Sequence, residues 1–370
     1  MRVENPYWQY LSGMKFFEHQ EPIDASSLSR WRNRLAQAGA QSLLEETIQA
    51  GLRMKFIKAS QLKKVNVDTT VQEKHVRFPT DARLYGRARE RLVELAKQRG
   101  LKLRQSYVRV GKRLMLKQSR YAHAKQYKRA QQCTRRLRTY LGRVIRDIGR
   151  RCPNPDPSLE KLLEVAQKIY HQKRRDKNKV YSVHAPEVEC LSKGKAHKRY
   201  EFGVKVSVGT TSRGGWQVGA QAHRGNRYDG HTLKATLEQI ERIVGKRVRQ
   251  VFVDGGYRGH GYSGEIEVHV DRKRRGKIAQ RLWKWMKRRA AVEPGISHLK
   301  HGHRMNRNRL KGRQGDELNV ILSAAGMNFT KLLRKAALCW RWIQVWLNQT
   351  EVMPLSIMFQ SNIHTIPSKA

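Results

Sequence analysis

Three acidic residues stand at positions of the sequence where a carboxylate could take part in a reaction. Asp254 directly follows the apolar run 251–253 and precedes two glycines, so it is predicted at the carboxyl end of a buried strand, where open α/β sheets place their ligands. Asp68 lies inside V-N-V-D-T-T-V, although strands disfavour aspartate. Glu293 lies in R-R-A-A-V-E-P-G-I-S-H-L-K. Clustered carboxylates can hold two divalent metal ions, which neutralise the attacking and leaving oxygens when a phosphodiester is cleaved.

Each of these carboxylates also has a simpler interpretation. Asp68 can lie on a solvated strand face, and Glu293 can be a helix-start carboxylate stabilised by the helix dipole, which is the better explanation when Glu293 is taken alone. Asp229, in Y-D-G-H-T-L with His231, competes with Asp254 for the role of second carboxylate. The pattern favours Asp229 as a helix N-cap, because the strand-end position of Asp254 is better suited to ligand binding.

Pro294 constrains the helix around Glu293. Proline removes a backbone donor inside a helix but is well placed in its first turn, so we expect a helix to restart or kink at Glu293. Glu293 and Lys300 lie seven residues apart and share one helical face. On that face the Glu293 carboxylate is suited to binding metal and the Lys300 ammonium to binding phosphate.

The composition predicts a nucleic-acid partner. The chain has 370 residues with 77 Lys and Arg against 30 Asp and Glu, a formal net charge of +47. Such an excess needs a polyanion to neutralise it, and DNA fits better than an acidic protein or a membrane. Neither a spanning helix nor a secretory signal is present in the sequence. We therefore expect a cytoplasmic protein associated with the nucleoid.

The four cysteines and the histidines do not predict a metal site of their own. Cys133, Cys152, Cys190 and Cys339 form no C-x-x-C pair, so the sequence indicates free thiols rather than a zinc site or disulfides.

Residues 1–60 are predicted to form a helical region for DNA binding or dimerisation. Ser26 or Ser27 is a candidate N-cap. Leu28, Trp31 and Leu35 recur at helical spacing and would pack, while Arg30, Arg32 and Arg34 project elsewhere. Two interpretations stay open: a helix-turn-helix-like DNA reader and a basic solvated helix.

Residues 61–335 alternate between strand and helix patterns. The strand at 63–72 has Val65, Val67, Thr69 and Val71 on one face. Residues 81 to about 176 form a basic helical insertion, with one long helix over 117–150 and a helix capped by Ser158. A hairpin at 200–208 and 216–222, a helix at 233–244, a strand ending at 253, a strand at 266–270 and a helix at 278–291 follow. The basic segments 272–275 and 301–313 and a helical segment at 318–333 follow. A C-terminal helix and tail over 336–370 complete the chain.

This order resembles that of ribonuclease-H-like nucleases, which assemble three carboxylates around divalent metal. N-V-D-T-T-V-Q, Y-D-G-H-T-L, V-D-G-G-Y-R-G-H and R-R-A-A-V-E-P-G-I-S-H-L-K together look like the DDE transposases of bacterial insertion sequences, in particular the insertion-sequence-five group. N-P-Y-W-Q-Y, S-S-L-S-R-W-R and R-M-N-R-N-R-L-K-G add to the likeness, which covers residues 3 to 335.

The resemblance implies an α/β fold: a ribonuclease-H-like mixed sheet flanked by helices, with the basic insertion between the first and second strands. It implies that Asp68, Asp254 and Glu293 bind two Mg²⁺ ions, or Mn²⁺ in their place. The family signature Y-x-x-R-x-x-x-E-x-x-x-x-x-x-K matches at Arg289, Glu293 and Lys300, but Met286 stands at the tyrosine position. The basic residues expected to contact DNA are Arg288, Arg289, Lys300, Arg304, Arg307, Arg309, Arg30, Arg32 and Arg34.

The implied activity is Mg²⁺-dependent cleavage of DNA at element ends, followed by strand transfer into target DNA. The implied partners are the terminal inverted repeats, target DNA and a second copy of the chain, with no membrane. Members of the group carry further helical sequence before N-P-Y-W-Q-Y, so this chain is expected to be a shortened or differently started copy. Two alternatives stay open: a nuclease without strand transfer, and an inactive transposase-derived DNA-binding protein.

Overall fold

A mixed six-stranded sheet organises the chain. The computed structural model describes residues 6, 9, 15–20, 24–192, 199–245, 247–271 and 280–350. The strand order is β2-β3-β1-β5-β6, and β4 pairs with β3. The strands are β1 (Lys64–Glu73), β2 (Glu189–Leu191), β3 (Glu201–Thr211), β4 (Gln217–His223), β5 (Gln250–Val253) and β6 (Glu267–Val270). The predicted strand at 63–72, the hairpin and the strand ending at Val253 are confirmed.

β1 is the central strand, antiparallel to β3 and parallel to β5. Its odd-numbered residues, among them Val65 and Val67, lie on one face, as the alternation predicts. The other face is also covered, because Asn66 and Gln72 are 1% exposed. The polar side of this strand is therefore a buried polar surface rather than a solvated one.

Different helices cover the two faces of the sheet. On the odd face, α7 (Asp229–Val244) packs against β3 and β4. The facing residues Gly209 and Gly219 have no side chain, and a Cβ at either would come within 2.6 Å of Ile240. The even face meets α8 (Gln280–Arg289), α9 (Val292–Gly302) and the start of α10 (Gly312–Thr350), since the Asn66 amide donates to Arg288 O and the Gln72 amide to Asp316 O.

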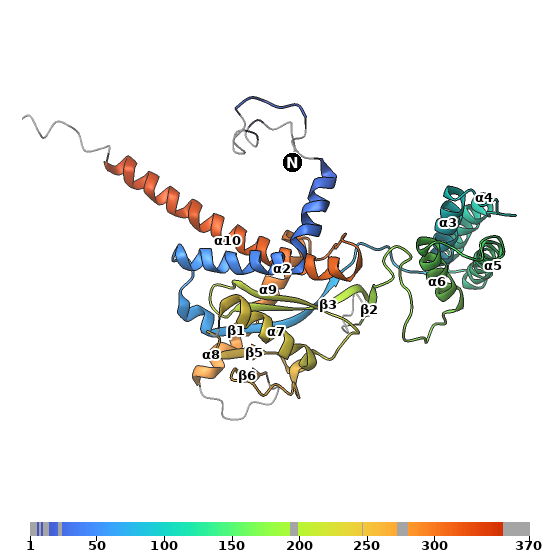
Figure 1. Cartoon of the computed structure of the whole chain (residues 1–370). Helices are drawn as coiled ribbons and strands as arrows, with labels where there is room; N and C mark the ends of the chain where they lie inside the picture. Colours follow the sequence, from blue (N-terminus) through green and yellow to red (C-terminus); the bar gives the residue numbers. More distant parts are fainter. Residues whose placement is uncertain are drawn as a thin grey trace, which may run out of the picture.

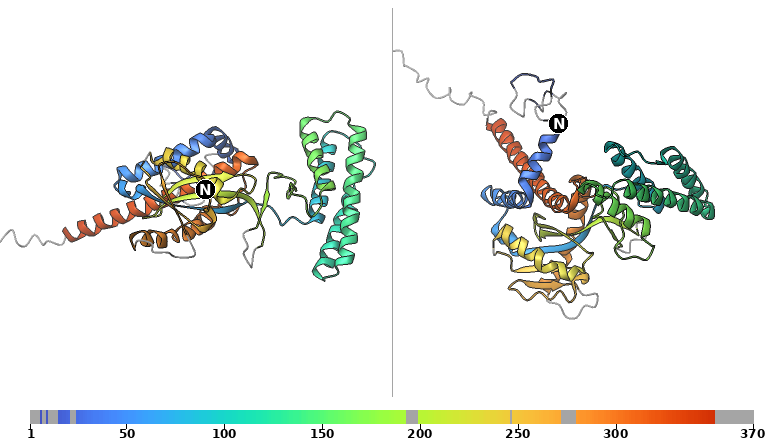
Figure 2. Two further views of the ribbon diagram at one scale, coloured as in Figure 1. Left: turned by 90° about the horizontal axis from the view of Figure 1, so that it is seen from below. Right: turned by 45° about the vertical axis from the view of Figure 1, so that its right-hand side comes forward.

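Residues 81–171 form four helices with a separate core. These are α3 (Asp81–Gln98), α4 (Val108–His123), α5 (Tyr127–Arg151) and α6 (Pro157–His171). They stand apart from the sheet and lie alongside one another (Figures 1 and 2). Their buried apolar residues, such as Leu92, Leu141 and Ile169, form a cluster distinct from that of the sheet. The expected helical segment between the first two strands is thus a compact bundle.

Two helix boundaries in the bundle differ from the prediction. The segment 117–150 is two helices, because the chain reverses at residues 124–126 with Lys125 at a φ of 57°. Asp156, not Ser158, caps α6, since its carboxylate accepts from Ser158 N. The bundle therefore contains an antiparallel α4–α5 hairpin in place of one long helix.

Helix α2 (Ala25–Arg53) is kinked at Ala36, where φ is 48°. Its first part points away from the sheet, while its second part packs along α10 (Figure 1). Leu28 and Trp31 are therefore 58% and 49% exposed, and the prediction that they pack is wrong; Leu35, beside the kink, does contact the core. The N-cap is Asp24 rather than Ser26 or Ser27.

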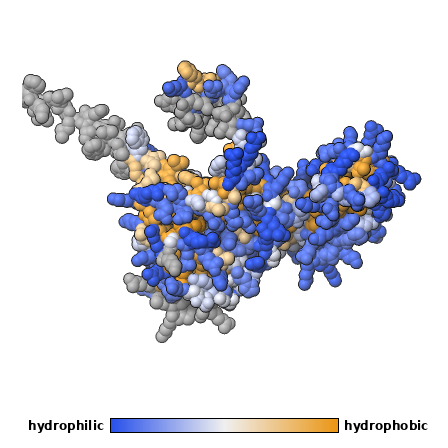
Figure 3. Space-filling view, in the orientation of Figure 1, coloured by the Kyte–Doolittle hydropathy of each residue, from blue (hydrophilic) through white to orange (hydrophobic). Residues whose placement is uncertain are grey.

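The last helix is longer than expected. α10 runs without a break from Gly312 to Thr350, where the sequence predicted two shorter helices. Its first half packs on α2 and β4, and its second half projects beyond the sheet (Figure 1). None of the described helices is long and apolar enough to cross a membrane. The visible surface is predominantly hydrophilic, above all over the bundle (Figure 3).

A buried ion cluster ties β1 to α10. Lys74 Nζ lies 2.8 Å from Asp316 Oδ1 and 3.0 Å from Glu187 Oε1, and the lysine side chain is 5% exposed. Asn308 donates to Asp316 Oδ1 at 2.6 Å and forms a bridge with Lys74. Burial raises the pKa of Asp316, although the lysine beside it acts in the opposite direction. The cluster links the end of the central strand, the returning chain from the bundle and the start of α10.

We predict that Lys74→Met lowers the free energy of unfolding of the sheet by about 3–5 kcal/mol, because it leaves buried carboxylates without their cation. The matched control is Arg53→Met, whose partner Glu46 is 57% exposed; it should cost less than about 1 kcal/mol. Urea denaturation followed by tryptophan fluorescence reports on the sheet, since residues 81–171 contain no tryptophan. Equal effects of the two substitutions would contradict a stabilising role for the cluster.

Candidate active site at the end of the central strands

The register between β1 and β5 brings Asp68 and Asp254 to one place. Asn66 pairs with Phe252 in the parallel ladder, and the chain remains extended through Asp254, where φ is −77° and ψ is 176°. Positions two residues further along each strand lie at matching heights on the same face. Asp68 and Asp254 therefore stand side by side on adjacent strands, on the face covered by α8 and α9.

Both carboxylates are held by backbone amides. Asp68 Oδ1 accepts from Thr69 N at 2.7 Å, and Asp254 Oδ1 accepts from Gly256 N at 3.0 Å. The second bond caps the short helix η2 (Gly255–Tyr257). Hydrogen bonds of this kind fix the orientation of each carboxylate.

Asp229 joins this group from the first turn of α7. A Cβ at Gly256 would lie 3.0 Å from Asp254 Oδ1 and 3.2 Å from Asp229 Oδ2, so both carboxylates approach the space that a side chain at Gly256 would fill. Asp229 is not the N-cap that the sequence favoured: Tyr228 holds that position, and the Asp229 carboxylate pairs with Lys205 Nζ at 3.0 Å instead. His231 is exposed and lies edge-on to Tyr228.

A buried tyrosine lies among the three aspartates. Tyr257 is 0% exposed, and its hydroxyl lies beside Thr232 without a hydrogen bond of ordinary geometry. Burial raises its pKa well above the ordinary value, and the negative charges of Asp68, Asp229 and Asp254 raise it further. The phenol therefore stays protonated beside a concentrated negative charge. No role for Tyr257 was predicted, since an aromatic residue after Gly-Gly is typical of an ordinary core position.

Lysine and histidine side chains support the cluster from β3 and β4. Lys205 also donates to Arg227 O at 2.6 Å, and it is only 8% exposed. His223 Nε2 lies 2.8 Å from Ser207 Oγ, which in turn donates to Thr232 Oγ1. Burial, and then the charges of Arg227 and Lys205, lower the pKa of His223 to about 4. Lys205 alternated with valines in the sequence and was therefore expected on a polar strand face.

Glu293 lies apart from the aspartates. It is an exposed residue in the first turn of α9, which follows α8 after a break at 290–291, as Pro294 predicted. Helix α9 packs against β1. Over the described parts of the chain, no three His, Cys, Asp or Glu side chains are close enough to hold a metal ion together. The structure thus places Asp68 and Asp254 on neighbouring strands, with Asp229 near them at the start of α7. Glu293 lies separately, on α9.

Arg289 and Lys300, the two basic residues of the signature, each lie near an acidic side chain. Arg289 is 14% exposed at the side chain and lies 3.7 Å from Asp271, and Lys300 is 12% exposed and lies 3.9 Å from Glu201. Met286, at the signature's tyrosine position, is 9% exposed and part of the core. The charges of Arg289 and Lys300 are thus partly compensated within the protein.

Arg288 belongs to a separate aromatic and cationic group. Its guanidinium lies 5.3 Å from the centre of the Trp285 ring, which Lys64 and Arg213 also approach, at 4.3 and 5.2 Å. A small cavity of about 320 Å³ opens beside this tryptophan. This aromatic and cationic group could not be predicted from the sequence, because the three cations come from segments far apart in the chain.

The remaining residues predicted to contact DNA lie in the segment after α9 and on the first part of α2. Arg304, Arg307 and Arg309 are all exposed, while Met305 and Asn308 between them are buried and hold the segment in place. Arg30 and Arg34 are exposed and Arg32 is half-buried on the first part of α2. The basic segment 272–275 lies outside the described residues.

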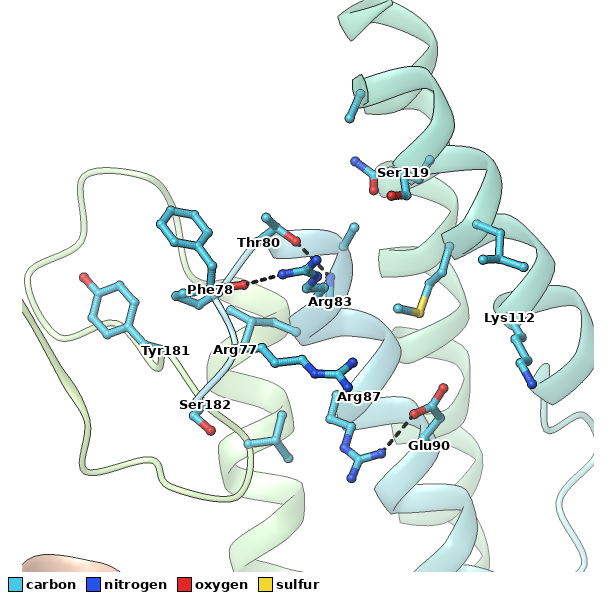
Figure 4. Close-up of a pocket in the computed structure, with 18 of the residues that line it drawn as sticks. Arg77, Phe78, Thr80, Arg83, Arg87, Glu90, Lys112, Ser119, Tyr181 and Ser182 are labelled. Carbon is cyan, nitrogen blue, oxygen red and sulfur yellow. Dashed lines mark hydrogen bonds and ion pairs between the residues drawn. The ribbon is translucent and has the colours of Figure 1, made fainter. Parts of the chain in front are cut away.

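A larger cavity of about 1210 Å³ lies elsewhere, between the bundle and the chain that leads into it (Figure 4). Several of its cations are already engaged: Arg83 donates to Phe78 O at 3.1 Å, and Arg87 pairs with Glu90 at 3.4 Å. Glu90 is the one carboxylate among the described lining residues. This cavity lacks the clustered acids found in the middle of β1 and directly after β5, so we assign the chemistry to those acids.

One family model matches part of the chain. Residues 167–329 match the family model described as "Transposase DDE domain". This part of the chain resembles the DDE domain of transposases. The match includes Asp229, Asp254 and Glu293, while Asp68 precedes it.

One relative of the chain is a protein of Rhizobium meliloti described as "Uncharacterized protein ORF8 in nfe locus". It is 48% identical over 125 residues, which make up 34% of this chain. The chain spans 60% of the length of that relative. No solved structure matches the chain.

We predict that the domain built on the sheet loses stability between pH 6.5 and pH 4 partly through His223. Its pKa of about 4 lies below the ordinary value of 6.5, so the unfolded chain takes up a proton in this range before the folded protein does. Stability from this group is complete above pH 6.5 and falls by up to about 3 kcal/mol as the pH drops through 4. His223→Gln should flatten that part of the pH profile in urea denaturation. An unchanged slope would show that His223 titrates normally.

Proposed function

We propose that the chain is a DNA transposase of an insertion sequence, which cleaves DNA at the element ends in a Mg²⁺-dependent reaction and joins the released 3′-hydroxyl to target DNA. One observation supports this most directly: the parallel ladder of β1 and β5 pairs Asn66 with Phe252, two residues before Asp68 and Asp254, although 186 positions separate the two aspartates in the sequence. Paired carboxylates at a sheet end are suited to divalent metal and phosphodiester chemistry.

The order of elements supports a ribonuclease-H-like fold for this domain. A central strand with Asp68 lies between an antiparallel hairpin and the parallel strand that leads to Asp254. The helix bearing Glu293 packs on the same central strand. In this proposal the four-helix bundle is an insertion into that fold rather than part of it.

The donor groups fit a hard divalent cation. Asp68 and Asp254 offer carboxylate oxygens already oriented by backbone amides, and Mg²⁺ binds such oxygens while keeping several of its waters. We propose that these two residues hold the ion or ions and that Glu293 supplies the third carboxylate. The metal, when bound, neutralises charge on the reacting phosphate and lowers the pKa of water.

The surrounding residues have definite tasks in this proposal. Lys205 compensates Asp229, which limits the mutual repulsion of the acids, and the protonated Tyr257 adds no charge of its own. Gly256 leaves space between Asp229 and Asp254. Because Glu293 is exposed on α9, we propose that α9 shifts toward β1 when DNA and metal bind, bringing that carboxylate to the pair.

The basic residues around the site supply the DNA contacts in this proposal. Arg304, Arg307 and Arg309 present their charges outward and are suited to backbone phosphates. Arg289 and Lys300 would exchange Asp271 and Glu201 for DNA phosphate. Binding of this kind weakens steeply as salt increases.

The test is a cleavage assay on DNA that flanks the protein's own coding sequence. We expect Asp68→Asn, Asp254→Asn and Glu293→Gln each to lower Mg²⁺-dependent cleavage by about 100-fold or more, since each removes a metal-binding charge. DNA binding in EDTA should be retained by all three. The matched control Asp176→Asn changes an exposed aspartate beside the bundle and should cleave normally.

The assay separates the alternatives. Cleavage followed by joining supports a transposase, and cleavage without joining indicates a nuclease. DNA binding without cleavage by the unmodified protein indicates an inactive DNA-binding derivative. Full activity in Asp254→Asn would overturn the assignment of the site.

A further inference from the structure

The four-helix bundle carries a charge excess that the proposed catalytic site does not use. Residues 81–171 contain 25 Lys and Arg against seven Asp and Glu. We propose that one exposed face of α5 binds the phosphate backbone of duplex DNA, as a second attachment point away from the carboxylates. This inference rests on the proposed function for its ligand, since the substrate of that function is duplex DNA.

The bundle can present such a face because its core holds α5 rigidly. Six residues of α5 turn toward the other helices and are at most 6% exposed: Ala130, Cys133, Leu137, Leu141, Val144 and Ile148. Helices α3, α4 and α6 all pack against α5. A surface on a packed helix is pre-organised, so binding loses little conformational entropy.

The opposite face of α5 is a straight row of cations. Lys128, Arg135, Arg146 and Arg150 follow one another at intervals of seven, eleven and four residues, which places them on one side of a helix. All four are exposed. The polar residues Gln132 and Thr139 fill the gaps in the row. We call these six residues the α5 row.

The acidic residues of the bundle do not neutralise the α5 row. No ion pair is formed by its four cations with any described part of the chain. Four acids form ion pairs outside the row: Glu90 with Arg87, Glu94 with Arg91, Asp156 with Arg99 and Asp147 with Arg151. Of the row, Arg150 is close enough to Asp147 for its charge to lower the pKa of that carboxylate. Uncompensated charges in a row repel one another and favour an anionic ligand.

The length of the row matches duplex DNA. Residues 128–150 span about 33 Å at 1.5 Å per residue, close to the roughly 34 Å of one duplex turn. Lysine, arginine, threonine and glutamine are side chains that commonly contact phosphates. The row has no large apolar residue that could anchor a protein partner, and its shape fits a linear polyanion.

The bundle stands to one side of the sheet (Figures 1 and 2), so this contact is separate from the contacts around Asp68 and Asp254. Two attachment points on one DNA molecule raise the effective concentration at each. The α5 row would therefore strengthen binding without reading the base sequence.

The test compares two full-length triple variants. Arg135→Gln, Arg146→Gln and Arg150→Gln remove three charges from the α5 row. The control removes three exposed charges elsewhere in the bundle: Arg91→Gln, which pairs with Glu94, and Lys161→Gln and Lys168→Gln, which flank Glu164 on α6. Affinity for a duplex of about 30 base pairs is measured by fluorescence anisotropy in EDTA over a series of salt concentrations.

We expect the row variant to bind at least about tenfold more weakly at low salt and its log–log salt dependence to be shallower by about 2–3, since each lost phosphate contact contributes about 0.9. The control should keep the slope of the unmodified protein. Replacing the same three arginines by lysine should restore the slope, which separates loss of charge from loss of folding.

Equal slopes for the row variant and the control would overturn the proposal, as would unchanged duplex binding with reduced binding of RNA or an acidic peptide. Because the assay contains no metal, its outcome does not depend on cleavage. A protein that binds through the α5 row but never cleaves would support this inference and refute the proposed transposition activity.

Discussion

The candidate site depends on the register of two parallel strands. β1 and β5 come from distant parts of the chain, and a shift of one residue would turn Asp68 or Asp254 to the opposite face. The register is fixed by buried residues on both faces, with Val65 and Val67 on one side and Asn66 and Gln72 on the other. The lysine and carboxylate cluster at Lys74 then holds the far end of β1 to α10.

Electrostatic compensation makes the acidic cluster compatible with folding. Asp229, Asp254 and Asp68 lie around one buried tyrosine, an arrangement that is costly without nearby positive charge. Lys205 supplies that charge directly to Asp229, and backbone amides supply partial charge to the other two. The compensation is strongest at Asp229, which leaves Asp68 and Asp254 as the better metal ligands in the proposed function.

The sequence predicted the sheet and its acids better than the contacts that hold them. Alternation located β1 and the hairpin, and the apolar run before Asp254 located the strand end, because these patterns are local. Lys205, Tyr257 and Asp316 escaped prediction, since their roles arise from partners that are distant in sequence. The exposure of Leu28 and Trp31 follows from a kink at Ala36, a residue whose type gives no sign of a left-handed backbone. The placement of Glu293 was only partly predictable: Pro294 located the helix start, but not its distance from the aspartates.

In the proposed function, Asp68 and Asp254 bind the same divalent ion. A double-mutant cycle on Mn²⁺ affinity tests this, with the affinity determined by electron paramagnetic resonance for the unmodified protein, Asp68→Asn, Asp254→Asn and the double variant. If both carboxylates hold one ion, each single substitution lowers the affinity strongly and the second adds little. Fully additive losses, or no loss in either single variant, would show that the two aspartates do not share an ion.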